Sequence, residues 1–449
     1  MSPRRPNLRR SACWIALACL VVPMFASYFF DDMFSSISYL FEHPSLTALG
    51  WDENMYGKYT SGYSVLCIFG GLALFGMLLD KWGVRVAGTL YMGMMVAGAG
   101  LVTWALLSGQ AKSAAVAYAG CMVFGLGSEM AGTVVNRSIG RWFKDGGMAL
   151  AMGLHLAIAR LGTAFALVIS PKLVVQQANH VYSLSETARP ALLGMGLMAV
   201  GLILWALFVT LDARRFPKRG GQENKADDFH FADAFKVLGN RNFWLLGLLC
   251  VLFYSSIVAF KKFAGAILIP RFGVPAEAAG WMVSMLPFAS VIFSPVFGML
   301  VDKKGKGTRL MIIGSLLAFA AHILLAFAPA GIPLFGYLSM VFLGFGYSLV
   351  PAALWPSVPK VVPEKVLGTA YSLVYWVQNI GLLSFKLLAG MILGSALGEA
   401  ADLALRQKGA VEVEIMFVSL TVAAILVAWL FARSSDRHPE LRLDEPAEN

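Results

Sequence analysis

The sequence predicts an all-α membrane protein with about twelve transmembrane helices, arranged as two six-helix halves with both termini in the cytoplasm. Three observations support this: the composition, the number of long apolar runs, and a motif that occurs once in each half. Of the 449 residues, 58% are hydrophobic and only 14% are charged. Soluble proteins have roughly 45–50% apolar and about 25% charged residues, so this chain lacks the polar surface that water requires.

The helices are predicted from apolar windows of roughly 18 to 25 residues, each long enough to cross a hydrocarbon core of about 30 Å. The first run starts near Ala12 and is expected to be a membrane helix, because no small-residue cleavage site follows it. In chain order the runs centre near Leu20, Gly70, Met95, Phe124, Ile158, Leu202, Phe253, Phe288, Leu317, Phe342, Gly381 and Ala424.

Basic residues alternate between successive gaps and so predict the orientation. The longest gap carries Arg214, Arg215, Lys218 and Arg219, whereas the odd-numbered gaps carry far fewer basic residues, such as Arg189. By the positive-inside rule this places both termini and the even-numbered gaps in the cytoplasm. The net charge of +10 is therefore a topology signal, and its dispersal over many short loops argues against nucleic-acid binding. We expect halves at residues 1–212 and 241–433, a cytoplasmic linker at 213–240 and a cytoplasmic tail at 434–449.

One motif occurs at the same point of both halves. "FGMLLDKWGVR" ends the second run and "FGMLVDKKGKGTR" ends the eighth. We expect the glycines to let helices approach closely and the aspartates to pair with arginine or cap the next helix, closing the cytoplasmic face. Ordinary turn chemistry is the alternative. The matching residues are Gly76, Asp80, Lys81 and Gly83, followed by Arg85, and Gly298, Asp302, Lys303 and Gly305.

This repeated motif in a chain of twelve runs resembles the major facilitator superfamily, and the resemblance covers nearly the whole sequence. Within it, "WFKDGGMALAMGLHLAIARLG" and "ALWPSVPKVVPEKVLGTAYSLVYWVQNIGLL" are similar to the lysosomal dipeptide uniporter branch. The resemblance implies the major facilitator fold, alternating access to a site between the halves, and small peptides as substrates.

Two opposite charges lie within successive apolar runs. Glu129 stands in "FGLGSEMAG" and Arg160 near the middle of "MALAMGLHLAIARLGTAFALVIS". One interpretation is a structural ion pair between them. The other is a midplane substrate site, because charge inside a membrane usually marks a substrate path and arginine binds carboxylates with two parallel hydrogen bonds. The resemblance implies that these two residues bind the two ends of a zwitterionic peptide.

Further residues are candidates for the same site. Trp355 matches the branch through "ALWP", and Pro356 after it predicts a local break of that helix. Asp32 is a candidate for ion coupling or for holding an amine. Three lysines depart from the branch and suggest a substrate richer in carboxylates. The additional candidates are Tyr59, Tyr63, Tyr375, Gln378 and Asn379, with the lysines Lys261, Lys262 and Lys386.

No catalytic motif is present, and neither a P-loop nor a set of metal ligands is found, so we expect neither an enzyme nor a cofactor or metal. The favoured function is a facilitator for dipeptides. A carboxylate or organic-anion carrier, as proton symporter or exchanger, is the alternative, and a non-transporting receptor is a third. We expect a small-molecule substrate, a lipid bilayer, no nucleic acid and a monomer, with an accessory subunit left open. Short termini favour a bacterial plasma membrane, with an organelle membrane as the alternative.

Overall fold

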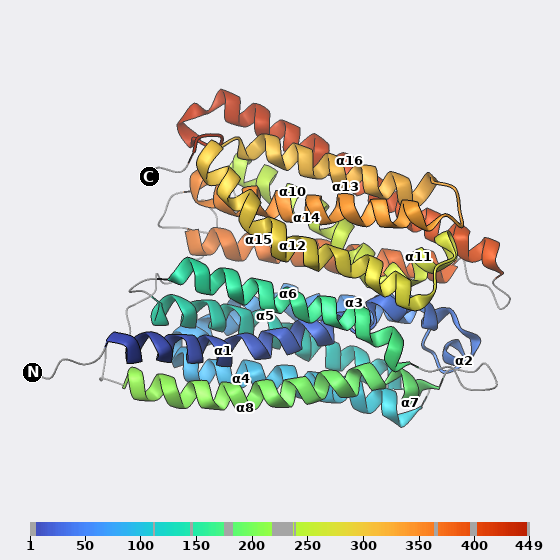
Figure 1. The fold of residues 1–449 in the computed structure, drawn as a ribbon, viewed down its shortest axis with the longest axis horizontal. Coiled ribbons are helices and arrows are strands. Elements are labelled where there is room, and N and C mark those ends of the chain that lie inside the picture. The colour runs from blue at the N-terminus through green and yellow to red at the C-terminus, as the bar shows by residue number, and fades with distance from the viewer. Residues whose placement is uncertain are drawn as a thin grey trace, which may run out of the picture.

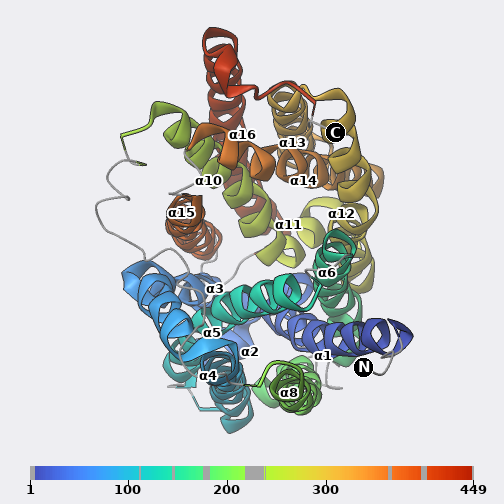
Figure 2. The same cartoon turned by 90° about the vertical axis from the view of Figure 1, so that its left-hand side faces the viewer.

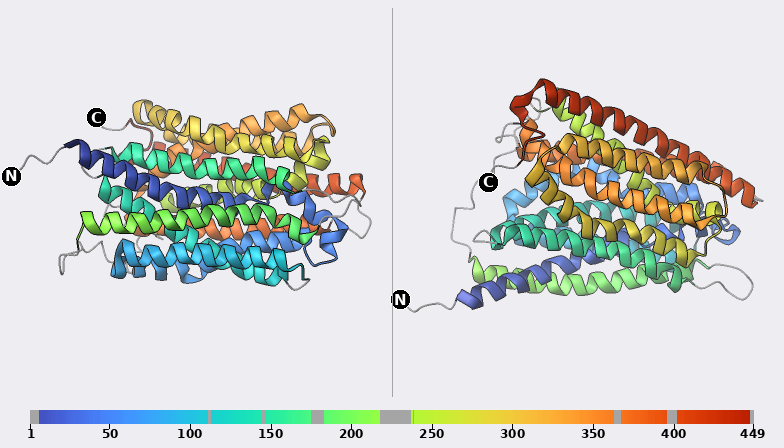
Figure 3. Two further views of the ribbon diagram at one scale, coloured as in Figure 1. Left: turned by 60° about the horizontal axis from the view of Figure 1, so that its bottom comes forward. Right: turned by 45° about the horizontal axis from the view of Figure 1, so that its top comes forward.

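The computed structural model describes residues 6–110, 113–143, 147–174, 183–217, 237, 239–362, 367–395 and 402–446. Twelve helices in these ranges are long and apolar enough to cross a membrane, as the hydropathy pattern predicts. They form two groups, one above the other in Figure 1, and both termini emerge at the same end of the molecule, which is the predicted cytoplasmic end. Figure 3 shows the same two groups from two further directions.

The first half begins at Pro6 and ends at Arg215. Its elements are α1 (Pro6–Asp32), η1 (Ser35–Glu42), α2 (Pro44–Thr47), α3 (Glu53–Leu66), η2 (Cys67–Gly71), α4 (Leu72–Ser108), α5 (Ser113–Trp142), α6 (Met148–Leu173), α7 (Leu184–Thr187) and α8 (Arg189–Arg215).

The second half begins at Arg241. Its elements are α10 (Arg241–Lys262), α11 (Ala264–Phe272), α12 (Ala276–Lys304), α13 (Gly307–Phe327), α14 (Pro333–Val361), α15 (Leu367–Ser395), α16 (Leu403–Arg437) and η4 (Pro439–Leu441). The predicted linker at 213–240 falls mostly outside the described residues, so its bounds stay a prediction.

Side-chain caps start several of these helices. The Asp52 carboxylate accepts a hydrogen bond from the Met55 amide at 2.6 Å, and Asp402 accepts one from Leu405 at 2.9 Å. Such caps satisfy amide groups that the first helical turn leaves without partners.

Helix α14 continues through Pro356, so the predicted local break of this helix is wrong. Packing against α12 and α13 supports a helix in which Pro351, Pro356 and Pro359 each remove one internal hydrogen bond.

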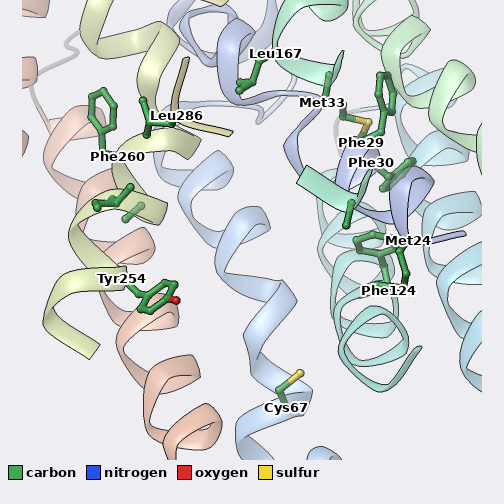
Figure 4. Close-up of a cluster of buried hydrophobic side chains, with 14 of the residues drawn as sticks. Met24, Phe29, Phe30, Met33, Cys67, Phe124, Leu167, Tyr254, Phe260 and Leu286 are labelled. Atoms are coloured by element: carbon green, nitrogen blue, oxygen red, sulfur yellow. The ribbon is translucent and has the colours of Figure 1, made fainter. Parts of the chain in front are cut away.

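The buried interior is apolar in both halves, and the outer surface is apolar as well. Figure 4 shows Phe29, Phe30 and Phe124 from one half and Tyr254 and Phe260 from the other among the buried side chains. Ile203 is 69% exposed, and other large apolar side chains also lie on the surface, such as Trp104, Leu150 and Met391. A surface of this kind suits contact with lipid.

The repeated motif adopts the same unusual backbone in both halves. Gly83 has φ 74° within α4, and Gly305 has φ 66° at the end of α12. Glycine alone enters this region without strain, which explains the last residue of each copy. The expectation that the motif glycines let helices approach closely is not met at Gly76 and Gly298 in this conformation. A Cβ added at either position would meet no atom within 4 Å.

The charged residues of the motif are exposed where the structure describes them. Lys81, Asp302 and Lys303 are exposed, and the Asp80 side chain lies outside the described residues. Arg85 instead donates from Nε to Asp212 Oδ2 at 2.7 Å. Asp212, at the end of α8, is fully buried and also accepts hydrogen bonds from Arg141 and from Trp142 Nε1. This network lies inside the first half.

The two halves are joined most closely at the end opposite the termini. There Gly57 of α3 packs against Gly390 of α15, and Gly265 of α11 packs against Ser36 of η1. In Figure 1, α6 and α12 come together at the right and diverge toward the left, and Figure 2 views the molecule from that left-hand end. We therefore describe the conformation as closed on the outer side, away from the termini.

Candidate substrate site between the halves

Arg160 lies on α6 and reaches across to the second half. Its Nη1 donates to Ser290 Oγ and, at 3.1 Å, to Ser294 Oγ, both on α12. Its guanidinium lies 5.4 Å from the ring centroid of Tyr347 on α14, in a cation–π contact. Among the residues that the structure describes, no carboxylate lies within ion-pair distance of it. The predicted ion pair with Glu129 is therefore absent.

A small cavity of about 30 Å³ lies beside this arginine at the junction of the halves. Its lining includes Arg160 and Lys261, three hydroxyl groups and an apolar floor. The hydroxyl residues are Tyr28, Thr163 and Tyr347, and the apolar residues are Ile257, Val258, Leu286 and Pro287. Tyr28 and Tyr347 escaped the sequence analysis, because isolated tyrosines in apolar runs carry no pattern that separates a cavity from the core.

Glu129 lies on α5, beside Tyr63 and Ser128. Tyr63 donates to the Ser128 hydroxyl at 3.1 Å, and Ser27 of α1 lies 2.6 Å from the same oxygen. Ser27 and Ser128 are the chain neighbours of Tyr28 and Glu129, and Tyr28 lines the cavity together with Arg160. Glu129 and Arg160 therefore both lie near Tyr28 without forming an ion pair with each other.

Lys261 and Lys262 are bound by carboxylates of α1. Lys261 Nζ lies 2.6 Å from Asp32 Oδ2, while Lys262 Nζ lies 2.9 Å from Asp32 Oδ1 and 2.7 Å from Asp31 Oδ2. Thr163 also donates to Asp32, at 2.7 Å. These ion pairs cross from the first half to the second. Asp32 and both lysines are thus engaged by protein groups, and we do not carry them forward as substrate ligands.

An aromatic wall leads away from Arg160 within the second half. Tyr254 lies edge-on to Tyr347, with centroids 6.2 Å apart, and accepts a hydrogen bond from Trp355 Nε1 at 3.0 Å. Trp355 in turn stacks on Tyr375, with centroids 5.0 Å apart. A continuous series of side-chain contacts therefore connects two predicted residues, Trp355 and Tyr375, to Arg160.

The remaining candidate residues do not line the Arg160 cavity. Gln378 contacts Cys250 Sγ at 3.7 Å, and Asn379 is buried with its Nδ2 donating to the Tyr375 carbonyl oxygen. Tyr59 is buried among Phe34, Trp51 and Tyr56, away from the cavity lining. Lys386 Nζ donates to the Thr60 carbonyl oxygen at 2.7 Å and lies 5.6 Å from the Tyr63 ring centroid.

Comparison with known proteins identifies the family. The model for the Major Facilitator Superfamily matches residues 24–385 and 263–448. The chain belongs to the Major Facilitator Superfamily. It is accordingly a multi-pass membrane transporter and not an enzyme. Secondary transporters of this superfamily bind substrate between their halves, and the lining of the Arg160 cavity comes from both halves.

Individual relatives differ in what they carry. The chain is 29% identical to the lysosomal dipeptide transporter MFSD1 of Homo sapiens, over 85% of this chain and 78% of that protein. It is 25% identical to the probable nitrate/nitrite antiporter NarK1 of Thermus thermophilus, over 72% of this chain and 74% of that protein.

Solved structures share the fold at low identity. A variant of the nucleoside transporter NupG has a TM-score of 0.71 at 13% identity, covering 93% of this chain and 99% of that one. PepTSo2 has a TM-score of 0.66 at 14% identity, covering 96% and 99%. At such identities the likeness concerns the fold alone.

Proposed function

We propose that this superfamily member carries dipeptides across the membrane by alternating access, as a uniporter. The observation that carries the proposal is the arrangement of Arg160 and Glu129. They lie on α6 and α5, near the same tyrosine, Tyr28, and have no ion-pair partner among the described residues. A zwitterionic peptide presents one carboxylate and one ammonium group, which these two side chains complement.

The roles follow from the chemistry of each group. The planar guanidinium of Arg160 donates two parallel hydrogen bonds to the peptide carboxylate, replacing its present bonds to Ser290 and Ser294. Glu129 accepts hydrogen bonds from the terminal ammonium. The wall of Trp355 and Tyr375 offers ring faces to the peptide side chains. The similarity to MFSD1 supports the same class of substrate.

A carboxylate or organic-anion carrier is the second candidate. The observation that favours it is the cavity lining, in which Arg160 and Lys261 are the charged residues. An organic acid would use these cations and would leave Glu129 without a role. The presence of Glu129 beside Tyr63 therefore favours the dipeptide over the organic acid.

Uptake by purified protein in liposomes tests the proposal. We expect labelled alanyl-alanine to enter down its own gradient, at the same rate with and without an imposed pH gradient. Succinate and nitrate serve as competitors of the second class. Uptake of succinate without uptake of alanyl-alanine would establish the organic-anion carrier instead, and a strict requirement for the pH gradient would replace uniport by proton coupling.

A further inference from the structure

One group of charged side chains between the halves holds more cations than carboxylates. Its members are Asp31, Asp32 and Glu129, and Arg160, Lys261, Lys262 and Lys386, of which Arg160 and Lys261 line the cavity; Glu42, Glu53 and Arg406 form a separate group at the outer end. Asp31 and Asp32 neutralise Lys261 and Lys262 through short ion pairs. Arg160, Lys386 and Glu129 remain. A zwitterionic dipeptide with a neutral side chain satisfies Arg160 and Glu129 and leaves one cation over.

That remaining cation is Lys386, on α15. Its side chain is 2% exposed, and its ammonium group makes one hydrogen bond, to the Thr60 carbonyl oxygen at 2.7 Å, among the residues that the structure describes. The Tyr63 ring adds a cation–π contact at 5.6 Å. An ammonium group has three donors, so this environment satisfies it only in part. Burying such a charge is costly without a carboxylate.

Lys386 is also connected to the proposed peptide site. It contacts the ring of Tyr63, whose hydroxyl bonds to Ser128, the neighbour of Glu129 in the chain. The long, flexible lysine side chain can therefore reach a group that is bound next to Glu129.

We propose that the preferred substrate is an acidic dipeptide, whose side-chain carboxylate binds Lys386. This inference rests on the proposed function. Its two carboxylates and one ammonium group complement Arg160, Lys386 and Glu129, none of which has an ion-pair partner among the residues that the structure describes. The α-carboxylate binds Arg160, the terminal ammonium binds Glu129, and the side-chain carboxylate supplies the partner that Lys386 lacks in this structure. A dicarboxylic acid without an amine leaves Glu129 unmatched.

Initial uptake rates in liposomes test this inference. The peptides are alanyl-glutamate, alanyl-glutamine and alanyl-lysine, which share a backbone and differ in side-chain charge, with free glutamate as a fourth probe. We expect kcat/KM for alanyl-glutamate to exceed that for alanyl-glutamine by about tenfold or more, the effect of one charged hydrogen bond. Alanyl-lysine and free glutamate should be the poorest substrates.

The variant Lys386→Gln assigns the preference to its residue. We expect the ratio of alanyl-glutamate to alanyl-glutamine uptake to fall about tenfold in this variant. Lys386→Arg keeps the charge and should retain most of the ratio. The matched control is Lys408→Gln, which removes a cation that is 68% exposed on α16, and it should leave the ratio unchanged.

The outcomes separate the two proposals. If no dipeptide is taken up, the proposed function fails. If alanyl-glutamine and alanyl-glutamate are taken up equally by the unmodified protein, or if free glutamate is preferred, the acidic-dipeptide inference alone is overturned. If the preference exists but persists in Lys386→Gln, its assignment to Lys386 is wrong. Because the comparison of peptides needs no variant, it remains decisive even where Lys386→Gln does not fold.

Discussion

Arg160 contacts hydroxyl groups and an aromatic ring, and these partners are what a substrate carboxylate could displace. The serines on α12 each accept one hydrogen bond and carry no charge. Exchanging them for a carboxylate therefore adds a favourable ionic interaction without breaking an existing ion pair. An arginine already bound to Glu129 would have to give up that pair first, so its absence leaves Arg160 available to substrate.

Removal of Arg160 should abolish dipeptide uptake. In Arg160→Ala the substrate carboxylate is desolvated without a partner, at a cost of about 2–5 kcal/mol, and Arg160→Lys should restore activity only in part. The measurement is uptake at matched membrane expression. In Arg160→Ala combined with Glu129→Ala we expect no recovery, because the two side chains are not paired. Recovery of transport in that double variant would instead identify a structural ion pair.

At the scale of elements, the ion pairs between α1 and α10 act as a junction of the halves. Asp32 is 1% exposed and binds both Lys261 and Lys262, while Tyr56 of α3 donates to the Lys262 carbonyl oxygen at 2.8 Å. The neighbouring Ser38 hydroxyl accepts from the Ala266 amide at 3.0 Å. These contacts cluster at the outer end, so they stabilise the conformation that is closed on that side.

The change Asp32→Asn should weaken this outer junction. Removing one partner of a buried ion pair leaves the other charge uncompensated and costs about 3–5 kcal/mol. We expect a cysteine placed at Ser36, which is fully buried here, to react faster with an impermeant maleimide when Asp32→Asn is present. Glu412→Gln, at an exposed ion pair with Lys408, is the control. Unchanged labelling in Asp32→Asn would show that glycine packing alone holds the junction.

The glycines of the repeated motif differ in backbone conformation: Gly83 and Gly305 have positive φ, whereas Gly76 and Gly298 do not. Gly83→Ala and Gly305→Ala should each lower the free energy of unfolding by about 1–3 kcal/mol, because alanine is strained at positive φ. A Cβ at Gly305 would also approach the Asp444 carbonyl oxygen to 2.2 Å. Gly76→Ala and Gly298→Ala should leave thermal unfolding unchanged yet slow uptake, since closing the cytoplasmic end brings these surfaces together. Equal destabilisation by all four changes would refute this distinction.

Across the whole molecule, the sequence predicts those features that are determined by the residues of a single segment. Twelve spans follow from local hydropathy, and the repeated motif predicts the two halves. The pairing of Lys261 with Asp32 was missed, because it depends on how α1 and α10 lie against each other. The alternative of a Glu129–Arg160 ion pair could not be decided from the sequence for the same reason: succession in the chain does not fix the directions of two side chains. Pro356 likewise broke no helix, because neighbouring helices support α14.

The orientation in the membrane can be tested directly. We expect cysteines at Gln222, in the predicted linker, and at Asp52, the exposed cap of α3, to react from opposite sides. An impermeant reagent added outside intact cells should label the Asp52 position only. Labelling of both positions from outside would overturn the assignment of the termini to the cytoplasm.

The Asp212 network has a consequence for how the protein is made. Its partners Arg85, Arg141 and Trp142 all precede it in the chain, and Asp212 itself stands at the end of the sixth span. Every group in the network is therefore synthesised before α10, which begins at Arg241. Since domains generally fold as units, amino-terminal first, the first half can lock its cytoplasmic end while the second is still being translated. Because the Asp212 network uses residues of the first half only, it can form before the second half is complete.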